Sequence, residues 1–169
     1  MRTIAFISVI LVTAFFSGCD GGLTPPPEIE PGFSGEIVFR QGTWPRSDSL
    51  FSLWLFASKI YPTDSVQVFN GIINTPPSIY LYPSFTENLP FGQDTLRYFF
   101  PLPPGNYIYI GVLHRFRNDI SVSSLQVVGV YKDPADTSKN GQLAITEQTL
   151  FTGIDIHVDF HTLPVQPFK

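Results

Sequence analysis

The sequence has little cysteine and little charge, and each shortage excludes a class of protein. Its 169 residues contain one cysteine, Cys19, so no disulfide can form within the chain. Only 14% of the residues are charged, and Asp and Glu outnumber Lys and Arg by 14 to 10, for a net charge of −4. Binding of DNA or RNA requires a surplus of basic residues, and we therefore exclude nucleic acid as a partner.

Internal repeats are absent from the sequence, and no segment after the first eighteen residues has a clear helical periodicity. The abundant residues are 16 Phe and 7 Tyr, together with 16 Pro and 13 Gly. Aromatic side chains favour strands, and Pro and Gly favour turns. The composition is typical of an all-β protein.

Residues 1–18 have the layout of a secretory signal. Arg2 is followed by an apolar run from Ile4 to Phe16, which is too short to span a membrane. The dipeptide Ser-Gly and then Cys19 follow, and this resembles the lipobox of bacterial lipoproteins, although Phe16 occupies the position where leucine is usual. The resemblance implies cleavage before Cys19 and attachment of a diacylglycerol to its thiol. The alternative is a soluble exported protein that is cleaved nearby and keeps a free thiol.

Residues 19–32 form the lipidated cysteine and a tether. The segment "DGGLTPPPEIEPG" has four prolines in thirteen residues and no apolar periodicity. Such a segment cannot bury enough surface to pack, and its prolines favour an extended backbone. At about 3.1 Å per residue, it would hold a domain about 40 Å from the lipid surface.

Residues 33–163 predict one domain of eight or nine short strands, and residues 164–169 predict a loose tail. The Asn70-Gly71 step, between two apolar runs, predicts a hairpin. Residues 50–60 fit either a strand or a helix, and their aromatic content favours a strand. The expected strands are "GEIVFR", "LFSLWLFASK", "SIYLYP", "TLRYFFPL", "NYIYIGVLH", "SLQVVGVYK", "QLAITE" and "GIDIHVDFH".

Three segments resemble the carboxypeptidase regulatory-like domains of transthyretin-like fold. They are "GEIVF" near the start of the domain, "FPLPPGNYIYIGV" over residues 100–112, and the closing "GIDIHVDF". The resemblance implies an antiparallel two-sheet sandwich without catalytic residues. The stretch around residues 62–95 is longer than the family pattern and looks inserted.

The closing strand carries candidate metal ligands. Its alternation places Asp155, His157, Asp159 and His161 on one face. Residues two apart lie about 7 Å from each other, so a strand supplies two neighbours to one zinc ion and a further ligand must come from elsewhere. His114 is the one other histidine. The simpler interpretation is that these residues form the solvent-facing side of a strand whose apolar alternates are buried. We favour that interpretation and predict no metal and no cofactor.

Other chemistry has weaker support. Residues 133–141 ("DPADTSKNG") contain Asp, Asn and Gly, but their spacing departs from that of a calcium loop, and we interpret them as a turn. No nucleophile elbow, phosphate loop or spaced triad occurs, so we expect no enzyme. A metal-binding protein or a hydrolase is the remote alternative.

The tyrosines offer a second way to bind a ligand. Tyr80, Tyr82, Tyr107 and Tyr109 are candidate residues for a platform that stacks on sugar rings. Strands also use aromatic residues to fill a core, so the same residues fit a structural role.

From the sequence we expect a lipoprotein of the bacterial cell envelope, anchored in the outer membrane rather than the inner, with a noncatalytic domain that binds or scaffolds envelope components. The lipid bilayer is one partner, and an envelope protein or a glycan is another. The alternative is a carbohydrate-binding module that uses exposed Tyr and Trp.

Overall fold

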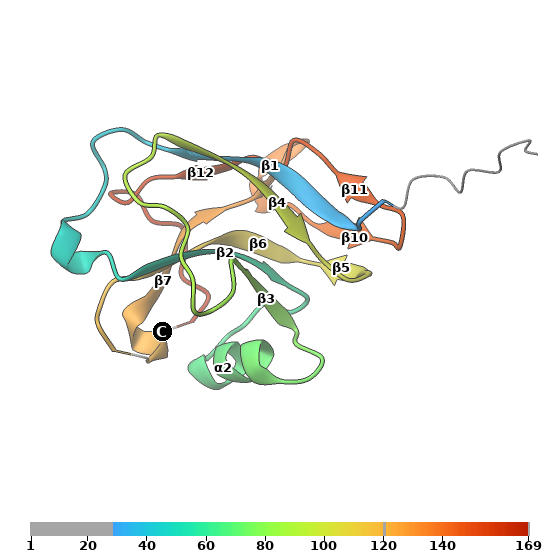
Figure 1. Ribbon diagram of the computed structural model, residues 1–169, viewed down its shortest axis with the longest axis horizontal. Helices are drawn as coiled ribbons and strands as arrows, with labels where there is room; N and C mark the ends of the chain where they lie inside the picture. Colours follow the sequence, from blue (N-terminus) through green and yellow to red (C-terminus); the bar gives the residue numbers. More distant parts are fainter. Residues whose placement is uncertain (1–28, 120, 169) are drawn as a thin grey trace, which may run out of the picture.

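The computed structural model describes residues 29–119 and 121–168, which form a mostly β fold with one α-helix (Figure 1). The predicted signal peptide, Cys19 and most of the predicted tether lie outside the described residues. In chain order the elements are β1 (Gly32–Phe39), η1 (Ser47–Ser49), β2 (Ser52–Ser58), α2 (Ser65–Ile73), β3 (Ile79–Tyr82), β4 (Thr95–Pro101), β5 (Gly105–Tyr107), β6 (Tyr109–Arg115), η2 (Val122–Ser124), β7 (Leu125–Val130), β8 (Lys132–Asp133), β9 (Asp136–Asn140), β10 (Leu143–Ile145), β11 (Leu150–Phe151) and β12 (Ile156–Val158).

Eight of the strands form one mixed sheet that curls into a half-barrel. The strand order is β11-β1-β12-β7-β6-β2-β3, and β4 pairs with β1. Two small pairs, β5 with β10 and β8 with β9, stand beside this sheet. The curl brings the edge strands β3 and β4 together, since the ring centroids of Tyr82 and Phe100 lie 5.5 Å apart. The prediction of a β-rich domain is confirmed, and the prediction of an antiparallel two-sheet sandwich is wrong.

The sandwich prediction failed at strand β1. β1 pairs with β4 in antiparallel fashion, but it pairs with β11 and β12 in parallel, with Ile37 opposite Ile156 and Phe39 opposite Val158. Short turns and alternating residues predict antiparallel neighbours close in sequence. A parallel pair between the first and last strands leaves no local signal, because the alternation of side chains is the same in both arrangements.

The inner face of the curled sheet encloses the larger hydrophobic core. Its side chains come from strands at both ends of the chain and are almost wholly buried. The largest of them include Phe33, Ile37, Leu53, Leu55, Tyr107, Ile110, Val112 and Ile156.

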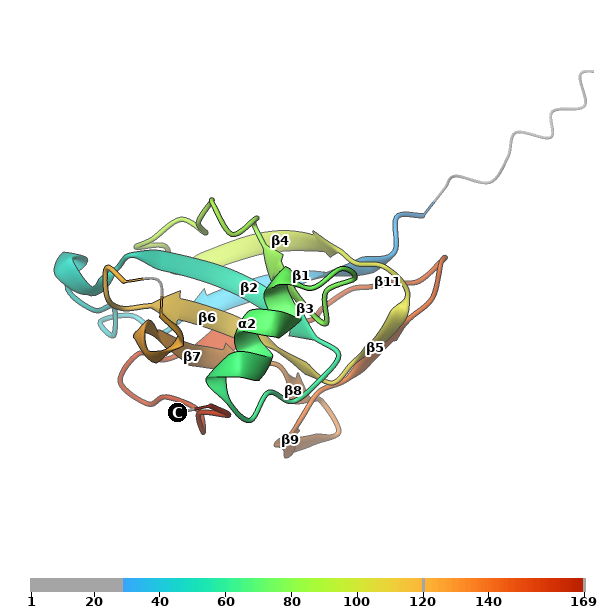
Figure 2. The ribbon, with the colours of Figure 1, turned by 90° about the horizontal axis from the view of Figure 1, so that it is seen from below.

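The outer face of β2, β6 and β7 carries a second core, which α2 covers. Figure 2 shows α2 crossing in front of β2 and β6. The residues of this second core are Trp54, Phe56, Val68, Tyr109, Leu113, Val127, Val130 and Phe168. All seven residues of β2 are buried, because its two faces point into the two cores. That double burial explains why residues 50–60 had no clear strand alternation, and the preference for a strand is confirmed.

Helix α2 occupies the place where the sequence predicted a hairpin at Asn70-Gly71. The helix begins after Asp64, whose carboxylate accepts a hydrogen bond of 2.9 Å from the backbone N–H of Gln67. Gly71 lies within the helix, where an added Cβ would be 2.7 Å from the side chain of Ile79. This glycine lets the helix approach β3 closely. The hairpin prediction is wrong because the packing of an apolar helix face on the sheet overrode the local turn signal.

The end of the chain packs on the outer core. Gln166 exchanges hydrogen bonds with the backbone of Val127, at 2.8 Å to its N–H and 2.9 Å to its carbonyl. Phe168 is buried in the second core beside Val68. Residues 164–168 are therefore held against β7, and they differ in this from the loose tail that the sequence suggested.

The close approach of β1 to the segment before β12 yields a stability prediction. A Cβ at Gly35 would lie 2.2 Å from the carbonyl oxygen of Ile154 and 2.5 Å from its carbon, both backbone atoms. We expect Gly35→Ala to lower the free energy of unfolding by about 1–3 kcal/mol, measured by chemical denaturation, because the two segments must separate. The neighbouring Ser34→Ala is the control: it removes only the long, 3.5 Å hydrogen bond to the carbonyl of Phe151 and should lower the free energy of unfolding by no more than about 0.5 kcal/mol. Equal stability of the Gly35→Ala and wild-type proteins would show that this close approach is not required.

Candidate functional site

The candidate metal ligands lie around the exposed side of β12, and their carboxylates are engaged by other protein groups. Asp155 accepts a hydrogen bond of 2.9 Å from the backbone N–H of Glu36. Asp159 forms an ion pair of 2.7 Å with Arg40. The hydrogen bond from Arg40 also holds the pKa of Asp159 below its usual value. His157 is exposed.

The geometry brings no ligand cluster together around these residues. The carboxylate of Asp159 accepts the backbone N–H of His161 at 2.8 Å, so it acts as a turn-forming group. Within residues 29–119 and 121–168, no three His, Cys, Asp or Glu side chains are grouped in a way that would hold a metal ion. His114 lies on β6 and points away from β12's exposed face, into the protein.

His114 is a fully buried histidine with two hydrogen-bond partners. Its Nε2 lies 2.8 Å from the carbonyl of Ser49, and its Nδ1 lies 3.1 Å from Nε2 of Gln126. A carbonyl accepts and an amide NH₂ donates, so the neutral ring with its proton on Nε2 satisfies both contacts. Burial lowers the pKa of His114 to about 4, and the hydrogen bond to Ser49 offsets this only in part.

Residues 133–141, interpreted from the sequence as a turn, form most of the β8–β9 hairpin, which begins at Lys132. The Asp133 carboxylate accepts the backbone N–H of Ala135 at 2.9 Å. The Asp136 carboxylate accepts both the N–H and the hydroxyl of Ser138. These contacts stabilise the hairpin. The carboxylates of Asp133 and Asp136 are thus both hydrogen-bonded within it.

A broad groove of about 1150 Å³ runs between this hairpin and the segment after β12. Its walls include His157, Asp159 and Tyr109, which the sequence had proposed for two separate sites. Tyr109 is buried, and its hydroxyl has no hydrogen-bond partner in the described part of the chain. Burial, and then the nearby Tyr61 hydroxyl, raise the pKa of Tyr109, so this group stays protonated. The walls of the groove are more apolar than polar, and its carboxylates already have protein partners.

The four candidate tyrosines do not form an exposed platform. Tyr107 and Tyr109 are buried, and Tyr80 and Tyr82 are half-buried. Tyr80 packs edge-on against Tyr107 at 5.8 Å between ring centroids, and Tyr107 donates a hydrogen bond of 2.7 Å to the carbonyl of Pro103. The rings of Tyr80, Tyr82 and Tyr107 belong to the inner core, and the ring of Tyr109 belongs to the outer core.

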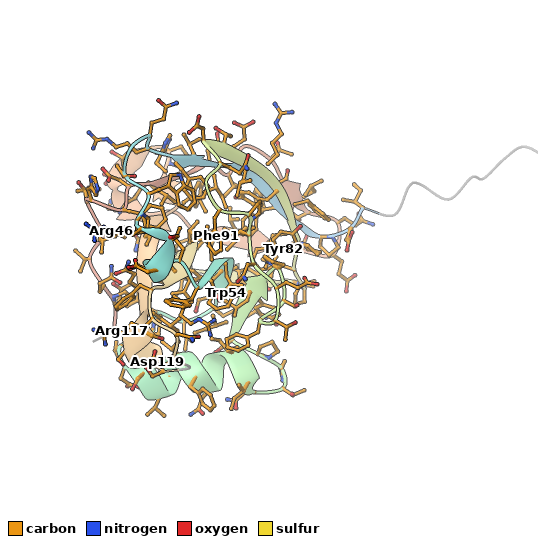
Figure 3. The ribbon with its side chains drawn as sticks, turned by 60° about the vertical axis from the view of Figure 1, so that its left-hand side comes forward. Arg46, Trp54, Tyr82, Phe91, Arg117 and Asp119 are labelled. Carbon is orange, nitrogen blue, oxygen red and sulfur yellow. The ribbon has the colours of Figure 1, made fainter. Side chains whose placement is uncertain are left out.

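A smaller pocket between α2 and the outer face of the sheet is almost entirely apolar and measures about 140 Å³. We call it the α2 pocket. In Figure 3, Trp54 lies above α2, and the loop that carries Arg117 and Asp119 lies beside the helix. The pocket is lined by Trp54, Val68, Phe69, Ile72, Ile73, Phe85, Arg115, Ser121, Val122 and Leu125.

Large apolar side chains stay exposed around the α2 pocket. Val66 is 64% exposed, Phe69 and Ile73 are each 55% exposed, and Phe85 is 46% exposed. Val66, Phe69 and Ile73 share one side of the helix, while Val68 on the other side packs on the sheet. A helix that is apolar on both sides is normally covered on both sides. The exposed side of α2 is thus an apolar patch on the surface of the described domain.

Sequence reasoning missed this surface because it assigned residues 65–74 to a hairpin. The spacing of Val66, Phe69 and Ile73, three and then four residues apart, is a helical signal, and Asp64 is a typical N-cap. Both signals were present, and the Asn70-Gly71 step outweighed them.

Comparisons with known proteins leave the site to be interpreted on its own geometry. No protein-family model, no curated protein and no solved structure matches the chain. Among the helices of residues 29–119 and 121–168, none is long and apolar enough to cross a membrane.

The burial of His114 predicts a pH dependence of stability. Its pKa of about 4 in the folded protein lies below the ordinary value of 6.5, so the unfolded chain binds the proton more readily. The contribution of His114 is therefore fully present above about pH 6.5 and falls by about 3 kcal/mol as the pH drops to about 4. Between pH 6.5 and pH 4, the His114→Gln protein should therefore lose about 3 kcal/mol less unfolding free energy than the wild type.

Chemical denaturation at several pH values measures this loss for each variant. His157→Gln is the matched control, since His157 is exposed and takes no part in the hydrogen bonds of His114, and this variant should keep the loss that is attributed to His114. If the wild-type and His114→Gln proteins lose equal stability on acidification, His114 is not the group that titrates.

Proposed function

We propose that this chain is a lipid-anchored protein of the bacterial cell envelope, in the outer membrane rather than the inner, whose β-rich domain binds another envelope protein without catalysis. The observation that carries the binding part of the proposal is the exposed apolar surface of α2 and Phe85 around the α2 pocket. Exposed apolar side chains grouped around a pocket are typical of a protein interface.

The size of the α2 pocket supports a protein partner. Small-molecule sites usually measure about 300–1,000 Å³, whereas this pocket measures about 140 Å³. A cavity of about 150 Å³ holds one benzene ring. The pocket therefore suits one aromatic or branched aliphatic side chain, which is the usual anchor at the centre of a protein–protein interface.

Two carboxylates of the larger groove are poorly placed to act as a general acid or base. A general acid or base needs a free titratable group that can reach a substrate. Asp155 and Asp159 in the groove bind Glu36 and Arg40 instead. The alternative of glycan binding through Tyr80, Tyr82, Tyr107 and Tyr109 loses support, because these rings are buried or half-buried.

The anchoring part of the proposal rests on Cys19 and the segment before it, which lie outside the described residues. Cys19→Ala removes the thiol that would carry the diacylglycerol, so we expect the protein to leave the membrane fraction for the soluble fraction. Fractionation of cells followed by immunoblotting measures this shift. A Cys19→Ala protein that still sediments with membranes would contradict lipid anchoring.

Photo-crosslinking in living cells tests the protein partner. With p-benzoylphenylalanine in place of Phe69, we expect one discrete adduct, because this exposed position lies at the edge of the α2 pocket. The same reagent at Leu150, which is 42% exposed on β11, is the control and should give no such adduct. Adding Ile73→Asp should abolish the adduct, since it places a charge in the proposed interface.

Two outcomes would contradict a partner at the α2 pocket. One is the same set of adducts from positions 69 and 150. The other is an adduct from position 69 that persists with Ile73→Asp.

A further inference from the structure

We propose that the partner inserts an aromatic or branched aliphatic side chain into the α2 pocket and places a carboxylate beside it, which pairs with Arg115. This inference deepens the proposed function and rests on it. It names the chemistry of the partner, an acidic and apolar segment of a protein.

The α2 pocket is preformed by fixed aromatic rings. Trp54 stacks on Phe85 with a centroid distance of 5.4 Å and an interplanar angle of 4°. The indole N–H of Trp54 donates a hydrogen bond of 2.8 Å to the carbonyl of Glu87. The backbone N–H of Leu89 donates to the carbonyl of Leu53 at 2.9 Å, which ties the same loop to β2. An anchor side chain would therefore enter a pocket whose walls need little ordering, and this favours affinity.

Arg115 supplies the one charge on the lining of the α2 pocket. It is the last residue of β6 and lies on the outer face with Leu113, beside an otherwise apolar wall. Its Nε is buried and makes no hydrogen bond, and none of the three ion pairs in the described part of the chain involves it. A buried donor without an acceptor is costly. The Arg115 side chain is partly exposed, so its guanidinium is open to a partner at the rim of the pocket. A carboxylate suits this guanidinium best, because it accepts two parallel hydrogen bonds.

Arg117, two residues further along, differs from Arg115 in its surroundings. It is exposed, and its guanidinium carbon lies 5.1 Å from the ring centroid of Phe116. It is not part of the pocket lining. Arg117 therefore provides a matched control with the same charge at nearly the same place in the sequence.

A free fatty acid shares the combination of an apolar group and a carboxylate. The volume of about 140 Å³ decides against it, because that space is filled by one ring-sized group and leaves most of a long acyl chain in water. A side chain on a protein segment fits the space and allows the rest of the segment to cover Val66, Phe69 and Ile73.

Titration with small probes tests the inference on the mature chain carrying Cys19→Ala, which has no acyl groups. The probes are hydrocinnamate, with a phenyl ring and a carboxylate, and its neutral amide, hydrocinnamamide. The measured signals are the NMR resonances of the Arg115 Nε–H and the Trp54 indole N–H. We expect hydrocinnamate to shift both signals and to bind about tenfold more tightly than the amide, as a charge-assisted contact implies.

Variants then assign the preference for the carboxylate to one residue. Arg115→Gln should remove the preference, and Arg117→Gln should keep it. Hydrocinnamate and its amide are also compared on the protein that keeps both arginines. This comparison needs no substitution, so it tests the inference even if Arg115→Gln lowers stability. Equal affinities for the acid and the amide, or a preference that is lost with Arg117→Gln, would overturn the role of Arg115.

A series of saturated acids separates a side-chain pocket from a lipid groove. From butanoate to octanoate to dodecanoate, we expect the affinity to stop rising once the pocket is full. A steady rise through dodecanoate would overturn the choice of a protein segment in favour of an acyl chain. If the adduct at position 69 forms equally with Arg115→Gln, the proposed function stands and this inference fails. If no adduct forms at all, the proposed function fails.

Discussion

The parallel pairing of β1 with the C-terminal strands is the constraint on which the rest of the structure depends. β1 lies between β4 on one side and β11 and β12 on the other, so residues from both ends of the described chain meet there. Gly35 allows this because the carbonyl of Ile154 occupies the space that a Cβ would need. The pairing curls one sheet around its own inner face, and a second sheet is not required to bury the apolar side chains of β1. The hydroxyl of Tyr98 on β4 also donates to the carbonyl of Ile154, which ties three segments together.

Local features of the sequence predicted the positions of most strands. They did not predict how the strands pair in the sheet. The strands β1, β3, β4, β7 and β10 appear where alternation or aromatic content placed them. For β2, burial on both faces removed the alternation, and aromatic content alone indicated the strand. The helix was missed because an Asn-Gly step is a turn signal that depends only on immediate neighbours, whereas α2 is held by packing on the sheet, including the close approach of Gly71 to Ile79 on the following strand, β3. The solvent-facing alternates of β12 followed from the pattern, but the α2 pocket combines residues from five separate segments and has no signature in the sequence.

Two hydrophobic cores on opposite faces of one sheet explain where an interaction surface arises. The inner core is closed by the curl of the sheet itself. The outer core is covered by α2, the short η2 segment, the end of the chain near Phe168, and the rings of Phe85 and Tyr61. A single helix of nine residues spans about 14 Å, which is too little to cover a sheet face of this width. The α2 pocket lies at the margin of that cover, where Phe69, Ile73 and Phe85 stay in contact with water.

The closure of the half-barrel and the shape of the α2 pocket depend on the same loop. This loop connects the edge strands β3 and β4, and it contributes Phe85 to the pocket and the buried Leu89 to the inner core. Hydrogen bonds from Trp54 and from the Leu89 N–H fix it to β2 and its surroundings. A partner that contacts Phe85 would therefore bind a segment that both cores already hold in place. Binding would then cost little conformational entropy in this loop. The stretch around residues 62–95, which looked like an insertion in the sequence, is in this structure both the bridge between the sheet edges and the support of the proposed interface.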